Sequence, residues 1–68
     1  MHLTISRDHP TPIPAQIAAG IRDAVASGAL SPGDAVPSTR AFAQQLGVSR
    51  GSVVTAYDQL EGEGYLLT

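Results

Sequence analysis

The chain has 68 residues, which sets one domain as the upper limit, and it contains no cysteine, which excludes a disulfide scaffold and a zinc–thiolate site. Four arginines and no lysine stand against six acidic residues, so the formal net charge is −2. No apolar run reaches membrane-spanning length, and no signal-peptide pattern opens the sequence. We therefore expect a cytoplasmic protein with no membrane partner.

Residues 1–10 are expected to form an N-terminal arm. Leu3 and Ile5 alternate with polar residues, which suits either a short edge strand or an extended segment lying on the domain. His2 and His9 have no partners at metal-ligand spacing, so we predict no metal site. We expect Arg7 to be solvated, with a phosphate contact as the alternative.

Residues 11–27 are predicted to form the first helix. Thr11 is its expected N-cap, Pro12 suits the first helical position, and Gly28 suits the left-handed residue that follows the helix. Arg22 is expected on a solvated face. Apolar residues recur every four positions and predict a stripe that faces the core: Ile13, Ile17, Ile21 and Val25.

A connector and a short C-terminal segment supply the expected β element. Residues 31–34 read as a turn, and Ala35 and Val36 leave room for only a very short strand before Pro37. Residues 65–68 are apolar and β-prone, with residues 35–36 as their nearest partner. A terminal strand without a hairpin mate predicts a wing that is truncated at the C-terminus.

Residues 38–60 have the pattern of two short helices joined by a tight turn. Ser38 and Ser49 are expected N-caps, and Gly47 can adopt the positive φ that ends the first of the two helices. A small residue, a glycine four positions later and a β-branched residue six positions after that are typical of a DNA-binding helix-turn-helix. In this chain they are Ala43, Gly47 and Val53.

The second of these helices has one polar side that a DNA groove would meet. Near its start, Ser49, Gly51 and Ser52 are short, so the helix end can approach DNA closely and direct its N–H groups at a phosphate. Arg50 is a candidate for either a phosphate clamp or a bidentate guanine contact, and Thr55 can offer its methyl group to thymine. Phe42 and Tyr57 lie on the apolar stripe and are expected in the core.

The order of these segments resembles the N-terminal winged helix-turn-helix domain of GntR-family bacterial transcription regulators. The resemblance covers residues 11–67, and its most specific parts are the sequences SGALSPGDAVPSTR, GVSR and AYDQLEGEGYL. The sequence VVTAY at residues 53–57 is most similar to the MocR-type subfamily.

This resemblance implies a mainly α fold with a small β element: a three-helix winged helix-turn-helix over residues 11–68, with its recognition helix at about residues 50–62 in the major groove. It implies a DNA-backbone contact for Arg40, near the helix start at Ser38, and places Ser49, Arg50 and Ser52 at the groove. It also implies an effector domain absent from this chain and a homodimeric full-length protein. In MocR-type members that domain binds pyridoxal phosphate, and nothing in these residues could bind it.

Sequence-specific binding of double-stranded DNA is thus the main functional hypothesis, and a protein-interaction winged helix without DNA binding is the alternative. The acidic balance and Gly51, which has no side chain to read a base, favour the alternative, whereas the positions of Arg40 and Arg50 disfavour it. About three phosphate contacts would give a slope of only roughly −3 in log K against log salt. An enzyme is not predicted, because no nucleophile, histidine or carboxylate pair has catalytic spacing.

Overall fold

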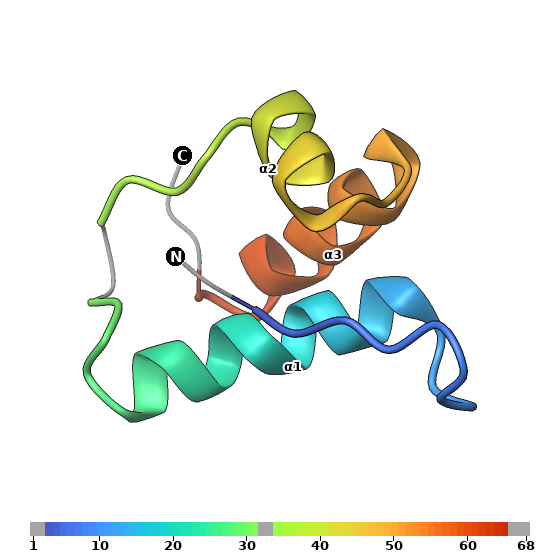
Figure 1. Ribbon diagram of the computed structural model, residues 1–68. Coiled ribbons are helices and arrows are strands. Elements are labelled where there is room, and N and C mark those ends of the chain that lie inside the picture. The colour runs from blue at the N-terminus through green and yellow to red at the C-terminus, as the bar shows by residue number, and fades with distance from the viewer. Residues whose placement is uncertain (1–2, 32–33, 66–68) are drawn as a thin grey trace.

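A computed structural model describes residues 3–31 and 34–65. It contains three helices, α1 (Ile13–Ala26), α2 (Thr39–Leu46) and α3 (Arg50–Gly62). In Figure 1, α1 runs beneath the pair formed by α2 and α3, and α3 packs against both other helices. The predicted three-helix, mainly α class is confirmed.

The three helices meet in one apolar core. Its members come from positions three or four apart in each helix, as expected for helix faces that turn toward one another. Burying each large side chain stabilises the fold by about 1.5–3 kcal/mol. The largest fully buried side chains are Phe42, Ile17, Ile21, Leu60 and Val53.

No strand is present in the part of the chain that the structure describes, so the small β element is not found there. Ala35 and Val36 lie in an irregular connector, and Val36 packs against the core. The remainder of the predicted wing, residues 66–68, and the centre of the predicted turn, residues 32–33, lie outside the described residues. Tyr65, the last described residue, donates its backbone N–H to the Leu60 carbonyl at 2.9 Å and packs against the core.

Helix α1 begins one residue later than the predicted N-cap at Thr11 implies. Its N-cap is Pro12, with φ −57° and ψ 149°, and no side chain caps the helix there. The proline ring fixes a φ that suits the extended conformation of an N-cap, which displaces Thr11 from that position. The predicted positive φ at Gly28 is confirmed, at 82°.

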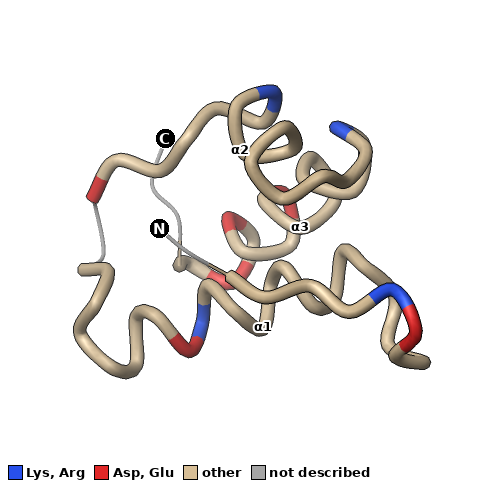
Figure 2. Tube along the Cα trace, in the orientation of Figure 1, with Lys and Arg blue, Asp and Glu red and all other residues tan. Residues whose placement is uncertain are grey.

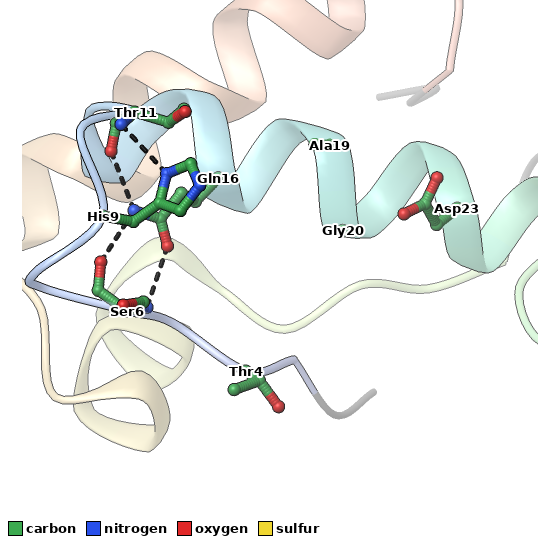
Figure 3. Close-up of a pocket in the computed structure, with 8 residues that line it drawn as sticks. All are labelled: Thr4, Ser6, His9, Thr11, Gln16, Ala19, Gly20 and Asp23. Carbon is green, nitrogen blue, oxygen red and sulfur yellow. Dashed lines mark hydrogen bonds between the residues drawn. The ribbon is translucent and has the colours of Figure 1, made fainter.

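The N-terminal arm lies along α1 as an extended segment, which was the second of the two expectations. Leu3 and Ile5 pack at the edge of the core. The Gln16 side chain accepts a hydrogen bond from the Ser6 N–H at 2.9 Å and donates to the Ser6 carbonyl at 2.8 Å (Figure 3). Leu3 also covers Gly20, where an added Cβ would lie 2.8 Å from the leucine Cδ2, so glycine permits the close approach of the arm.

Two arginines expected to be solvated instead join separate segments. Arg22 forms a bidentate ion pair with Glu63, with Nε–Oε1 at 2.9 Å and Nη2–Oε2 at 3.0 Å, and so links α1 to the end of α3. Hydrogen bonds from Arg22 and, secondarily, from Gln59 hold the pKa of Glu63 below its usual range. Arg7 donates to the carbonyl of Gly47 and so ties the arm to the turn between α2 and α3.

Candidate nucleic-acid interface

A left-handed glycine makes the tight turn between α2 and α3. Gly47 has φ 69° and ψ 35°, a conformation that glycine adopts without the steric cost of a Cβ. The chain then reverses, and the Val48 N–H donates to the Ala43 carbonyl at 3.0 Å. With Ala43 and Val53 buried on the facing helices, the predicted helix-turn-helix is confirmed as a structure.

Both helices of this motif begin at a serine cap, as predicted. The Ser38 hydroxyl accepts a hydrogen bond from the Ala41 N–H at 3.1 Å. The Ser49 hydroxyl accepts from the Ser52 N–H at 3.2 Å and lies 2.9 Å from the Ser52 hydroxyl. Both caps leave the first N–H groups of each helix, which have no intrahelical acceptor, directed outward along the helix axis.

The amino ends of α2 and α3 adjoin each other. The Nε of Arg50, the first residue of α3, donates to the Oγ1 of Thr39, the first residue of α2, at 3.3 Å. Arg40 follows Thr39 and is exposed, without a hydrogen-bond or ion-pair partner among the described residues. Figure 2 shows the basic segments of α2 and α3 at these neighbouring ends. Two helix dipoles and two guanidinium groups therefore make one electropositive end of the motif.

Tyr57 fixes the connector before α2 against the middle of α3. Its hydroxyl donates to the Pro37 carbonyl at 2.7 Å, one residue before the Ser38 cap. Its ring stacks on Phe42, with ring centroids 6.2 Å apart and the rings inclined by 27°. Burial raises the pKa of Tyr57 to about 12. Phe42 is fully buried and Tyr57 half-buried, which confirms their predicted place in the core.

The predicted site residues separate into three groups. Ser38, Arg40 and Arg50 lie at the adjoining helix ends, described above. Gly51 and Thr55 are exposed on the side of α3 opposite its buried stripe, and no atom lies within 4 Å of a Cβ added at Gly51. Ser49 and Ser52 bond to each other in the cap, and Ser52 is half-buried.

Acidic side chains lie away from this electropositive end. Residues 35–57 contain no aspartate or glutamate, although the whole chain is net negative. The three acids that follow belong to the second half and the end of α3: Asp58, Glu61 and Glu63. Figure 2 shows this separation, with acidic segments on the later part of α3, on α1 and in the loops. The polarity of α3 therefore runs from positive to negative along its length.

Sequence reasoning missed two contributors, Thr39 and Arg7. Thr39 lies eleven residues from Arg50, and Arg7 lies forty residues from Gly47. Each contact joins two separate segments of the chain, so no periodicity within one helix or strand could reveal it. The nearest signal was the position of Thr39 directly after a predicted N-cap and directly before Arg40.

A hollow of about 330 Å³ lies between the arm and α1, and several of the groups that line it bond to one another. Gln16 bonds to Ser6 and to the Thr11 carbonyl, and the Thr11 N–H donates to His9 Nδ1 at 3.1 Å (Figure 3). These groups hold the arm in place. The described segments contain no cluster of three metal-ligating side chains. Within them, no helix combines the length and apolarity that crossing a membrane requires.

Comparisons with known proteins agree with this geometry. Residues 14–68 match the family model described as bacterial regulatory proteins, gntR family. The chain is 59% identical over 66 residues to the pyridoxine biosynthesis transcriptional regulator PdxR of Corynebacterium glutamicum, covering 97% of this chain and 15% of that protein. It is 41% identical over 64 residues to the probable rhizopine catabolism regulatory protein MocR of Rhizobium meliloti, covering 94% of this chain and 13% of that protein.

A solved structure shows the same fold. YtrA from Sulfolobus acidocaldarius, a GntR-family transcription factor, superposes with a TM-score of 0.93 at 41% sequence identity, covering 97% of this chain and 70% of that one. The likeness to MocR confirms the subfamily expected from the sequence at residues 53–57. The fold and its relatives are those of transcription regulators and not of enzymes. The chain belongs to the gntR family of bacterial regulatory proteins, as its helix-turn-helix DNA-binding domain.

Proposed function

We propose that this domain reads duplex DNA by placing the amino end of α3 in the major groove. The observation that carries the proposal is the convergence of two capped helix ends with Arg40 and Arg50 in a stretch free of acids. Helix N-termini and guanidinium groups both bind phosphate, and guanidinium also binds guanine in a bidentate manner. Gly51 and Thr55 then face the base edges from the next positions of the helix.

The negative second half of α3 favours an end-on approach. Asp58 is exposed and follows Gly51 by seven positions, which places it about 10 Å further along the helix axis. Lying flat in the groove would bring this carboxylate against the phosphates, whereas end-on insertion keeps it farther away. The net negative charge was the main support for a protein-interaction role, and the separation of charges along α3 removes that support.

The chain spans only a small share of the length of the two curated relatives. The role of the whole protein therefore includes more than the role of this domain. We infer that the domain is the reader of a larger cytoplasmic regulator that acts as a homodimer. Two recognition helices would then lie about 34 Å apart, one turn of DNA. A MocR-type partner domain that binds pyridoxal phosphate is part of this proposal and lies outside residues 1–68.

The test begins with selection of a preferred duplex from a random pool and titration of that duplex with three proteins. Arg50→Ala should weaken binding by about 1–3 kcal/mol relative to the unaltered chain, because it removes a groove contact. Arg22→Gln is the matched control: it also removes one positive charge, but its side chain lies against Glu63, remote from the adjoining helix ends. Equal affinity of all three proteins would contradict the assigned role of Arg50.

A further inference from the structure

We propose that the N-terminal arm braces the helix-turn-helix, with Arg7 as a positioning residue for the amino end of α3. This inference rests on the proposed function and assigns part of the DNA-reading geometry to a segment outside the motif. It starts from the hydrogen bond that the Arg7 side chain donates to the Gly47 carbonyl, forty residues away along the chain. Gly47 makes the turn between α2 and α3, and Ser49, the cap of α3, follows two residues later.

The arm is fixed to α1 directly before Arg7. The half-buried side chain of Gln16 holds both backbone groups of Ser6: its Oε1 accepts from the Ser6 N–H at 2.9 Å, and its Nε2 donates to the Ser6 carbonyl at 2.8 Å (Figure 3). Arg7 is the next residue, so its backbone starts from a held position. The contacts therefore run without interruption from Gln16 of α1 to Gly47 of the turn.

The brace acts at the part of the motif that core packing holds least. Helix α3 packs against both other helices, but no Cα of α1 lies within 8 Å of a Cα of α2. The first fully buried side chain of α3 is that of Val53, the fourth residue of the helix. The three residues before it are the ones that we propose to meet DNA. An external contact at the turn therefore has its largest effect at this end of α3.

A guanidinium suits this place for a second reason. Gly47 ends α2, and the last carbonyls of a helix carry the negative end of its dipole, so a cation is stabilised there. The other task open to Arg7 is direct contact with a DNA phosphate. The two tasks have different requirements: a phosphate contact depends on charge, whereas the brace depends on the bond to Gly47 and on the attachment of the arm at Gln16.

The first measurement needs no DNA. The Val48 N–H lies inside the turn and donates to the Ala43 carbonyl at 3.0 Å, so its hydrogen exchange reports opening of the turn. Arg7→Gln should speed this exchange about two- to fivefold relative to the Ile21 N–H in the same sample, within the range that one hydrogen bond contributes. The ratio to Ile21, which is fully buried on α1, corrects for any change in global stability.

Arg22→Gln is the matched control for this exchange measurement. It also removes one positive charge and breaks a contact between distant segments, but that contact joins α1 to the far end of α3. The exchange ratio should therefore not change in Arg22→Gln. An unchanged ratio in Arg7→Gln would overturn the brace.

Titration of the selected duplex then tests the effect on DNA binding. Arg7→Gln should weaken binding about two- to fivefold and leave the slope of log K against log salt unchanged, because no phosphate contact is lost. Gln16→Ala keeps every charge but frees Ser6, so it should weaken binding to a similar extent. The double variant should bind as well as either single variant, since both substitutions break the same series of contacts. A slope shallower by about one unit in Arg7→Gln identifies a phosphate contact and contradicts the inference.

Thermodynamic linkage gives a reciprocal check. If the braced chain binds DNA more tightly, DNA favours the docked arm by the same factor. The Ser6 N–H loses its acceptor when the arm leaves Gln16. Its exchange should therefore slow, on addition of the selected duplex, by about the factor by which Gln16→Ala weakens binding. Exchange at Ser6 that does not respond to the duplex shows that the arm and DNA are not coupled.

Failure of the brace and failure of the proposed function are distinguishable. If Arg50→Ala weakens binding of the selected duplex while Arg7→Gln and Gln16→Ala do not, the proposed function stands and the brace is wrong. If Arg50→Ala leaves binding unchanged, the amino end of α3 does not meet DNA, and the proposed function and this inference fail together.

Discussion

Tyr57 is the residue whose protonation the fold controls most clearly. Its hydroxyl donates to the Pro37 carbonyl, and burial raises its pKa to about 12, above the value of about 10 for an unfolded tyrosine. Between these two values the folded chain retains a proton that the unfolded chain has lost. The free energy of unfolding should therefore fall as pH rises from about 10 to about 12, and this contribution should be constant below that range.

Urea denaturation of the unaltered chain and of Tyr57→Phe, from about pH 9 to about pH 12, measures the effect. The phenylalanine variant retains the ring stacked on Phe42 but cannot lose a proton, so its stability should fall less steeply with pH. The chain has no lysine, which leaves few other groups to titrate there. Parallel pH profiles for the two proteins would show that the Tyr57 hydroxyl does not control stability.

Helix α3 has an outward-facing glycine, Gly51, near its start and a second glycine, Gly62, at its far end. This pair allows a matched test of how the helix as a whole contributes to stability and to DNA binding. No atom lies within 4 Å of a Cβ added at Gly51 or at Gly62. Alanine at either position should stabilise the helix by up to about 1 kcal/mol, because glycine has the larger backbone entropy to lose. The two substitutions should differ in their effect on DNA binding.

Gly51→Ala should weaken binding of the selected duplex, because its methyl group would stand between the amino end of α3 and the base edges. Gly62→Ala should leave that affinity unchanged. Thermal unfolding and duplex titration of both variants provide the two measurements. A Gly51→Ala variant that is both more stable and equally tight in binding would show that α3 does not approach DNA through this face.

The element boundaries show which features a local pattern can predict. The caps at Ser38 and Ser49 and the turn at Gly47 depend on backbone chemistry within a few residues, and each was predictable. The N-cap predicted at Thr11 was wrong. A cap-forming side chain and a proline stand side by side there, and both suit the N-cap position of the same helix. The DNA contacts assigned to Arg40, Arg50 and Thr55 stay predictions.

Contacts between distant segments could not be predicted, because they depend on how the finished elements pack. The arm residue Arg7 reaches Gly47, and Arg22 of α1 reaches the end of α3 at Glu63. Each of these side chains also has an ordinary solvated interpretation when only its sequence neighbours are considered. Only the docking of the arm and of α1 on the helix-turn-helix brings the partners within hydrogen-bond distance.

At the scale of the whole molecule, net charge is a poor guide to where DNA binds. The formal charge of −2 is the sum of an arginine-bearing, acid-free stretch at residues 35–57 and acids placed elsewhere. Attraction to phosphate acts over about 8–10 Å at ordinary salt, which is shorter than the 30 Å length of the molecule. The local field at the adjoining helix ends therefore decides the encounter, and the remote acids contribute little.

The acid that should oppose binding is the one on the recognition helix. Asp58 is exposed on the outward side of α3, whereas Asp34 lies in the connector before α2. Asp58→Asn should raise the affinity for duplex DNA, selected and unrelated alike, because it removes repulsion from phosphates near the groove. Asp34→Asn changes the net charge by the same amount and should have the smaller effect. Titrations between about 50 and 200 mM salt should show the difference between the two variants shrinking as screening increases. Equal gains from the two substitutions would mean that net charge, and not the polarity of α3, governs association, and the end-on approach of the helix would lose its electrostatic basis.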